Sequence, residues 1–164
     1  MSGAAVIIPA TDASWAGIWP IFREVVAAGQ TYAYPEDLTC EQARELWMER
    51  PPGRTVVAVD GDTVLGSAKM GANRPGRGSH VATASFMVGE AHRGRGVGRL
   101  LGLDALAWTR ASGYAAMQFN AVVETNPAVA LWQSLGFQII GTVPEAFDSA
   151  ADGLVGLHVM YQRL

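Results

Sequence analysis

A run rich in glycine and arginine carries the clearest chemical signal in the sequence. Residues 93–99 read Arg-Gly-Arg-Gly-Val-Gly-Arg and lie between a predicted strand and a predicted amphipathic helix. Glycines let backbone N–H groups turn toward one point and let a ligand approach without an obstructing Cβ atom. The first turn of the helix adds unpaired donors and the positive end of its dipole, and the guanidinium groups add forked donors. The run therefore predicts a site for phosphate or pyrophosphate.

Two common nucleotide-binding motifs do not fit this run. A P-loop ends in lysine followed by serine or threonine, and that pair is missing, so hydrolysis of ATP or GTP is not expected. Gly94, Gly96 and Gly98 also lack the spacing of the dinucleotide fingerprint, and no early βαβ unit surrounds them. Without the arginines, a glycine-rich segment between a strand and a helix would be a weak signal, because it could also be a simple turn.

The distribution of charge favours a compact anionic ligand. The chain has 12 Lys and Arg against 15 Asp and Glu, a formal net charge of −3. Residues 71–103 hold five arginines and one acid, whereas the rest of the chain holds seven basic and fourteen acidic residues. A protein that binds the nucleic acid backbone would need a wider basic surface, so no nucleic acid partner is expected. From charge alone, a solvated charged surface is the alternative.

Length and composition set further limits. A chain of 164 residues that is 49% hydrophobic predicts one globular domain over residues 1–164. The single cysteine, Cys40, excludes an intrachain disulfide, and no His, Cys, Asp and Glu combination has the spacing of metal ligands, so no metal is expected. The longest charge-free stretch, 125–144, is too polar to span a membrane, and no export leader is recognised at the N-terminus. We therefore expect a cytoplasmic protein without a membrane partner.

Hydrophobic periodicity and turn residues predict the elements that must position this site. Pro20 inside the first helical pattern predicts a kink or a restart, Thr39 and Gln42 have the spacing of a capping box, and the acidic segment 145–153 is expected to be a loop. The expected elements are a strand at 5–9, helices beginning near 15 and 39, strands at 55–59, 63–70 and 80–88, a helix at 98–112, a strand at 116–123, a helix from 127 to 135, and strands at 137–143 and 154–161. This order is mixed α/β and has too many hairpins for a doubly wound sheet.

Two motifs resemble those of the GNAT superfamily of acyl-CoA-dependent N-acetyltransferases. Arg93-x-x-Gly96-x-Gly98 matches the first signature of that family, and Asn126-Pro127-Ala128 together with Leu135-Gly136-Phe137 looks like the second. The resemblance covers essentially the whole chain. It implies a mixed α/β GNAT fold, with a mostly antiparallel sheet of about six to seven strands, splayed at the acetyl-CoA cleft and flanked by about four helices.

The resemblance also implies a cosubstrate and a mechanism. The pyrophosphate of acetyl-CoA would lie on the backbone amides of the glycine-rich run, and pantetheine would lie beside the splayed strands. A substrate amine would attack the thioester directly, and a backbone N–H near Val88 would polarise the carbonyl group. The expected cofactor-binding residues are Phe86, Met87, Val88, Arg93, Gly94, Arg95, Gly96, Val97, Gly98, Arg99, Asn126 and Trp132.

The sequence departs from the family pattern at the second signature. Many members place a tyrosine there as the acid for the leaving thiolate, whereas this chain has Trp132. Water or Tyr161 would then protonate the sulfur, or CoA would leave as the thiolate. The helix is also one residue shorter than usual, so either Thr125 or Asn126 could meet pantetheine. Glu124 is the candidate base, and its alternative role is an exposed carboxylate near a helix N-terminus.

A narrower resemblance bears on the acceptor. The segments around Asn120 and Thr83 look like those of fungal acetyltransferases that act on the proline analogue azetidine-2-carboxylate. That resemblance implies that Asn120, and more weakly Thr83, holds a substrate carboxylate; a bulge or strand end is the structural alternative for Asn120. Tyr32 and Tyr34 lie in the loop that usually forms the substrate rim, where packing is an equal alternative.

The sequence thus predicts a transfer of acetyl from acetyl-CoA to the amine of a small molecule. The alternatives are a protein or peptide N-acetyltransferase and a non-catalytic module that only binds CoA. Because family members often form dimers, a homodimer is a further expectation.

Overall fold

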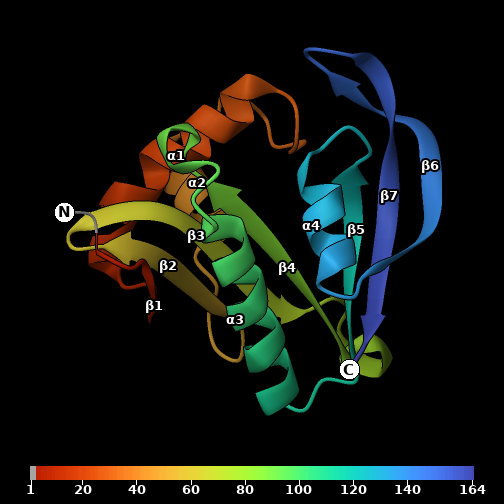
Figure 1. The fold of residues 1–164 in the computed structure, drawn as a ribbon, viewed down its shortest axis with the longest axis horizontal. Helices are drawn as coiled ribbons and strands as arrows, with labels where there is room; N and C mark the ends of the chain where they lie inside the picture. Colours follow the sequence, from red (N-terminus) through yellow and green to blue (C-terminus); the bar gives the residue numbers. More distant parts are fainter. Residues whose placement is uncertain (1–2) are drawn as a thin grey trace.

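The computed structural model describes residues 3–164, and its elements follow the predicted order (Figure 1). Seven strands and four α-helices are present within the described residues, so the expected α/β architecture is confirmed. In chain order the elements are β1 (Val6–Pro9), α1 (Trp15–Ala28), α2 (Cys40–Trp47), β2 (Arg54–Asp60), β3 (Thr63–Ala72), β4 (Val81–Val88), α3 (Val97–Ala111), β5 (Ala116–Val123), α4 (Ala128–Ser134), β6 (Gln138–Ser149) and β7 (Gly153–Arg163).

The strands form one open sheet in the order β1-β2-β3-β4-β5-β7-β6. Every neighbouring pair is antiparallel except β4 and β5, which are parallel. These two strands pair only at Val81–Ala116 and Ala82–Met117, and beyond Ala82 they diverge toward their carboxyl ends (Figure 1). The predicted splay is therefore confirmed, and it lies in the middle of the sheet.

Helices cover both faces of the sheet because the strand residues alternate between two apolar clusters. Ala82 and Ala84 of β4 belong to a cluster that includes Leu101 and Ala105 of α3. Met87 points the other way, into a cluster formed mainly by α1 and α2. Figure 1 shows α3 and α4 in front of the sheet, on either side of the splay.

The first two helices match their sequence signals closely. Helix α1 ends at Ala28 and is capped by Gly29, whose φ of 63° is the left-handed conformation that glycine adopts readily. It continues through Pro20, so the predicted restart does not occur. The capping box of α2 is confirmed: Thr39 Oγ1 accepts from the Gln42 N–H at 3.2 Å, and Gln42 Oε1 accepts from the Thr39 N–H at 2.9 Å.

The expected loop over residues 145–153 is wrong. Strand β6 continues to Ser149 and pairs with β7, leaving only residues 150–152 as the turn. A register shift between Val143 and Phe147 accommodates Glu145, whose φ is 53°. Phe147 is buried against β5 and β7, and this apolar contact outweighs the acidic sequence that predicted a loop.

Candidate acetyl-transfer site

A cleft of about 840 Å³ opens where β4 and β5 diverge. Its walls come from segments far apart in sequence: the end of α1 with the following loop, the last six residues of β4, the glycine-rich turn with the start of α3, the second half of β5, and the first turns of α4. The cleft is thus formed by the break in the sheet and is closed at its narrow end by the two paired rungs.

The glycine-rich turn presents backbone donors to this cleft. Gly94 and Gly96 have φ values of 73° and 78°, and a Cβ atom at either position would meet nothing within 4 Å. Helix α3 begins at Val97, and the Leu100 N–H bonds to the Gly96 carbonyl. The N–H groups of residues 97–99 therefore have no carbonyl partner within the helix and are free to bind an anion.

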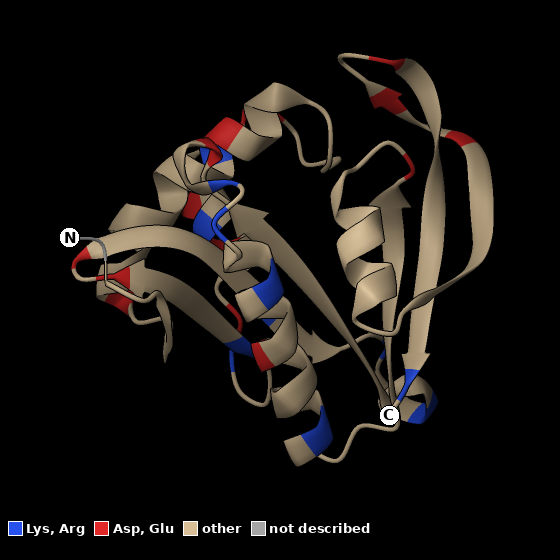
Figure 2. Cartoon of the chain, in the orientation of Figure 1, with Lys and Arg blue, Asp and Glu red and all other residues tan. Residues whose placement is uncertain are grey.

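The three arginines of the turn have different environments. Arg93 and Arg99 line the cleft, and Arg99 also donates to Ser134 Oγ of α4 at 3.3 Å. Arg95 is directed toward Asp60, with an N–O distance of 3.4 Å, and does not line the cleft. Figure 2 shows basic residues on the loop before α3 and on its first turn. The arrangement leaves two arginines to support the backbone donors.

Along β4, the backbone N–H and C=O groups of successive residues point alternately toward β3 and toward the cleft. The pairing with β3 uses the odd-numbered residues, as the bonds from Asn73 to Val81 and from Gly89 to Leu65 show. The N–H and C=O groups of residues 84, 86 and 88 therefore face the cleft. Within the described chain, no strand pairs with β4 there beyond Ala82. This free edge lies where the sequence predicted pantetheine.

The three predicted cofactor residues on β4 have two different roles. Phe86 and Val88 face the cleft with their backbone, and Phe86 packs on Trp132 with ring centroids 4.5 Å apart. Met87 is 2% exposed, packs in the α1–α2 cluster and pairs with Ser67 of β3. Met87 also borders the cleft, and its buried side chain supports the cleft from the side of α1 and α2.

The second signature forms helix α4 and its cap. Asn126 Oδ1 accepts from the Ala128 N–H at 2.9 Å, and Asn126 lines the cleft whereas Thr125 does not. Trp132 is 5% exposed and packs edge-on against Phe119 at 5.2 Å, so its indole serves mainly as an apolar wall. Close contact with Gly102 of α3 completes this packing.

The two predicted proton-transfer residues do not reach the cleft. The Glu124 carboxylate accepts from the Gly156 N–H at 2.6 Å, and its backbone N–H bonds to the carbonyl of the same residue. Tyr161 pairs with Gln118 of β5, near the closed end of the splay. Neither side chain lines the cleft, so the structure does not bring these two residues together with the cosubstrate site.

Predicted acceptor-binding residues lie on the opposite side of the cleft from α3. Asn120 and Thr83 both line it. Asn120 lies in a register shift between Phe119 and Val122, so it is both a bulge residue and a cleft residue. Gln118 Nε2 donates to Asn120 Oδ1 at 3.0 Å, and Asn120 Nδ2 donates to Asn73 Oδ1 at 2.6 Å. Gln118 could have been found from its spacing of two along the strand, but nothing in the sequence indicates Asn73.

The two tyrosines of the predicted rim also line the cleft, stacked with ring centroids 5.8 Å apart. Tyr34 packs on Phe22 of α1 at 5.2 Å, and burial raises the pKa of its hydroxyl, with Glu49 adding to the effect. The Tyr32 hydroxyl donates to the Phe86 carbonyl at 2.7 Å and accepts from the Phe86 N–H at 2.8 Å. Tyr32 therefore contacts the free edge of β4 directly.

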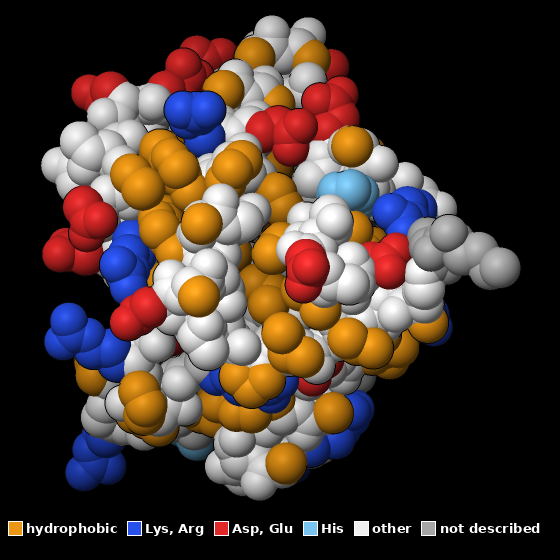
Figure 3. Space-filling view, turned by 90° about the vertical axis from the view of Figure 1, so that its left-hand side faces the viewer, with side chains coloured by type: hydrophobic (Ala, Val, Ile, Leu, Met, Phe, Trp, Pro, Cys, Tyr) orange, Lys and Arg blue, Asp and Glu red, His pale blue; other side chains and the backbone are white. Residues whose placement is uncertain are grey.

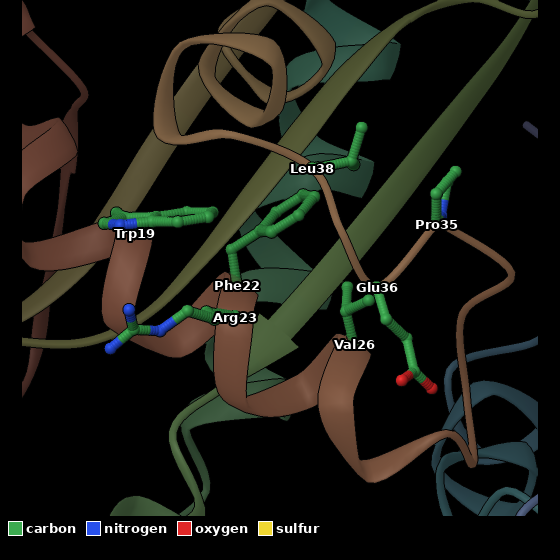
Figure 4. A pocket seen from close by; sticks show the side chains of 7 residues that line it. All are labelled: Trp19, Phe22, Arg23, Val26, Pro35, Glu36 and Leu38. Carbon is green, nitrogen blue, oxygen red and sulfur yellow. The ribbon is translucent and has the colours of Figure 1, made fainter.

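Among the described residues, a second hollow is much smaller than the cleft. A hollow between α1 and the segment before α2 has a volume of about 10 Å³, which is room for one water molecule (Figure 4). Arg23 and Glu36 border it and point away from each other. On the face in Figure 3, acidic side chains gather near the top and basic ones are scattered.

Within residues 3–164, no group of three or more His, Cys, Asp and Glu side chains is close enough to hold a metal ion. No helix in the same range is both long and apolar enough to cross a membrane.

Comparison with known proteins agrees with this geometry. Residues 18–137 match the acetyltransferase (GNAT) family, and the chain belongs to that family. A GCN5-related N-acetyltransferase from Kribbella flavida is 61% identical, with a TM-score of 0.96 and 98% of each chain covered. The predictions of a GNAT fold and of an acetyl-CoA-dependent acetyltransferase are therefore confirmed at the level of the family.

Two more distant proteins are also similar. A phosphinothricin acetyltransferase from Sinorhizobium meliloti, solved with acetyl-CoA, has a TM-score of 0.88 at 23% identity, covering 99% of this chain and 89% of its own. The N-acetyltransferase aca1 of Schizosaccharomyces pombe is 28% identical over 74% of this chain. The match spans 66% of that relative's own length.

Proposed function

We propose that this chain acts in the cytoplasm as a single-domain N-acetyltransferase over residues 1–164, moving acetyl from acetyl-CoA to the amine of a small molecule. The observation that carries the proposal is the cleft in the sheet, with free helix N–H groups at its mouth and an unpaired strand edge along its wall. The mouth suits a pyrophosphate and the edge suits the amide groups of pantetheine. The phosphinothricin acetyltransferase solved with acetyl-CoA has the same fold.

In the proposed reaction, the amine nitrogen attacks the thioester carbonyl carbon in a ternary complex. The C–N bond forms, the C–S bond breaks, and the sulfur leaves with the bonding electron pair. A free thiol has a pKa of about 8.5, so departure as the thiolate is feasible near neutral pH. Because Glu124 and Tyr161 lie outside the cleft, we assign the amine proton to water and no protein acid to the sulfur.

For the acceptor, we propose an amino acid or a close analogue. The Asn120 amide donates to Asn73 and has a second N–H that is suited to a carboxylate oxygen. Thr83 lies on the facing strand and lines the same cleft. The polar side chains of Asn120 and Thr83 line the same cleft as the aromatic rim of Tyr32 and Tyr34. This combination supports a small acceptor with one charged group beside the amine.

A panel of amines tests the proposal through release of the CoA thiol. The panel holds azetidine-2-carboxylate, proline analogues, small amines without a carboxylate, and peptides with free N-termini. Turnover of the carboxylate-bearing amines supports the proposal. Turnover of peptides alone would favour a protein N-acetyltransferase, and acetyl-CoA binding without any turnover would indicate a CoA-binding module.

We also propose that two copies associate through β6. This edge strand has no neighbour on its outer side within the described chain, and Ile140 and Val143 are 59% and 54% exposed. Long apolar edge strands are aggregation hazards unless they are covered. Sedimentation of the wild type and of Val143→Lys tests this: a dimer that the variant dissociates supports it, and a wild-type monomer refutes it.

A further inference from the structure

One hydroxyl group takes the place of a missing strand on the free edge of β4. Tyr32 lies in the loop between α1 and α2, 54 residues away from Phe86 in sequence. Its oxygen donates to the Phe86 carbonyl at 2.7 Å and accepts from the Phe86 N–H at 2.8 Å. Both backbone polar groups of Phe86 are thus bonded, although the neighbouring strand has already diverged.

The bonded residue lies between two others that face the same way. Ala84 precedes it and Val88 follows it on the same edge, each about 6.7 Å away along the strand. The glycine-rich turn lies beyond the carboxyl end of β4. A cosubstrate anchored by its pyrophosphate at that turn therefore meets Val88 first and reaches Phe86 with its acyl end.

We propose that Tyr32 is a positioning residue of the acetyl transfer: its hydroxyl holds the Phe86 peptide so that the adjoining free edge of β4 aligns the thioester with the acceptor. The inference rests on the proposed function. An unsupported strand edge could twist, and a misplacement of about 1 Å at the reacting atoms can slow a reaction about a hundredfold. The hydroxyl also connects the loop that borders the acceptor site to the strand that aligns acetyl-CoA.

The same environment argues against a role for Tyr32 as the acid. Burial raises the pKa of the Tyr32 hydroxyl above its ordinary value of 10.0, despite the opposing effect of its bond to Phe86. Proton transfer to a thiolate, whose conjugate thiol has a pKa of about 8.5, would then run uphill. The single hydroxyl proton is moreover directed at the Phe86 carbonyl.

The test replaces Tyr32 with Phe, which keeps the ring and its stacking on Tyr34 but removes the hydroxyl. The matched control is Tyr114→Phe, because Tyr114 packs on Trp108 of α3 and does not line the cleft. Three quantities are measured with acetyl-CoA and azetidine-2-carboxylate: kcat, the KM of acetyl-CoA, and the pH profile of kcat. Amide hydrogen exchange at Phe86 and Val88 is measured in parallel. If Tyr32→Phe does not fold, Tyr32→Met serves instead, since it also lacks the hydroxyl and fills space flexibly.

We expect kcat to fall about 10- to 100-fold, the KM of acetyl-CoA to change by less than about threefold, and the pH profile to keep its shape. Exchange at Phe86 should become faster, and the control should match the wild type. An unchanged kcat would overturn the proposal, as would loss of the alkaline limb of the pH profile, which marks an acid. An increase in KM that alone explains the loss of kcat/KM would assign the hydroxyl to binding instead and would also overturn it.

Failure of the proposed function gives a different result. If the wild type releases no thiol with any amine in the panel, the transfer reaction itself is refuted. Hydrogen exchange then still decides the local question. Faster exchange at Phe86 in Tyr32→Phe would show that the hydroxyl holds the edge of β4. Unchanged exchange would refute that role.

Discussion

Gly96→Asp tests the assignment of the anion site at its centre. Gly96 is the residue before α3, and the N–H groups of residues 97–99 after it have no helical partner. A side chain has room there, since a Cβ atom would meet nothing within 4 Å. The backbone φ of 78° costs a non-glycine residue about 1–2 kcal/mol, and Asp and Asn tolerate it best. The variant should therefore fold.

The introduced carboxylate would occupy the site itself. A carboxylate at this position lies beside the unpaired N–H groups at the start of the helix and competes with the pyrophosphate for them. Each charge-assisted hydrogen bond is worth about 1.5–3 kcal/mol, so the loss of two such donors would cost the pyrophosphate about 3–6 kcal/mol. This corresponds to a rise of about 10²- to 10⁴-fold in the Kd of acetyl-CoA. Repulsion between like charges adds to the loss.

Isothermal titration with acetyl-CoA measures the effect, and Gly96→Asn is the matched control because it has the same shape without the charge. The Asn variant should lose about tenfold or less in affinity, and added salt should narrow the gap between the two variants because it screens the charge. Thermal unfolding confirms that both variants fold. A folded Asp variant that binds acetyl-CoA within about threefold of the wild type would refute the assignment.

Three further outcomes are expected. Trp132→Phe should keep kcat within about threefold, because the indole is an apolar wall; loss of several orders of magnitude in a folded variant would contradict this. Asn120→Ala should lower kcat/KM about 10- to 100-fold for acceptors with a carboxylate and much less for those without, while the acetyl-CoA Kd stays constant; equal losses would return Asn120 to a structural role. The free energy of unfolding should fall as pH rises above 10, because the pKa of Tyr32 is higher in the folded chain than in the unfolded chain, which loses this proton first. Chemical denaturation at several pH values should show a smaller fall for Tyr32→Phe than for the wild type.

The sequence was most informative where local chemistry decides the structure. The glycine-rich turn, the capping box at Thr39 and the left-handed end of α1 at Gly29 each depend on a few adjacent residues. Periodicity was enough to order the strands and helices, because most of them bury one clear apolar face. These features also define the proposed anion site, since it is built from one continuous segment.

Contacts between distant segments were harder to predict. The bond from Tyr32 to Phe86 and the chain from Gln118 through Asn120 to Asn73 depend on how strands lie side by side. Glu124 looked suitable as a base from its place after β5, but pairing with β7 gives its carboxylate a backbone partner. Segment 145–149 was predicted as part of a loop because it is acidic, and the burial of Phe147 and Ser149 depends on pairing with β7.

The short parallel pairing of β4 with β5 has a consequence for folding cooperativity. Within the described chain, two rungs of backbone pairing join β1–β4 to the other three strands, and one apolar cluster beneath α3 provides further contact between the halves. A pantetheine chain bonded to both strands would supply the missing rungs. Either CoA or acetyl-CoA should then raise the midpoint of denaturant unfolding, because the product fills the same gap as the cosubstrate. A cosubstrate bound in this way would act as the linking strand of the sheet, and the coupling would persist until CoA is released.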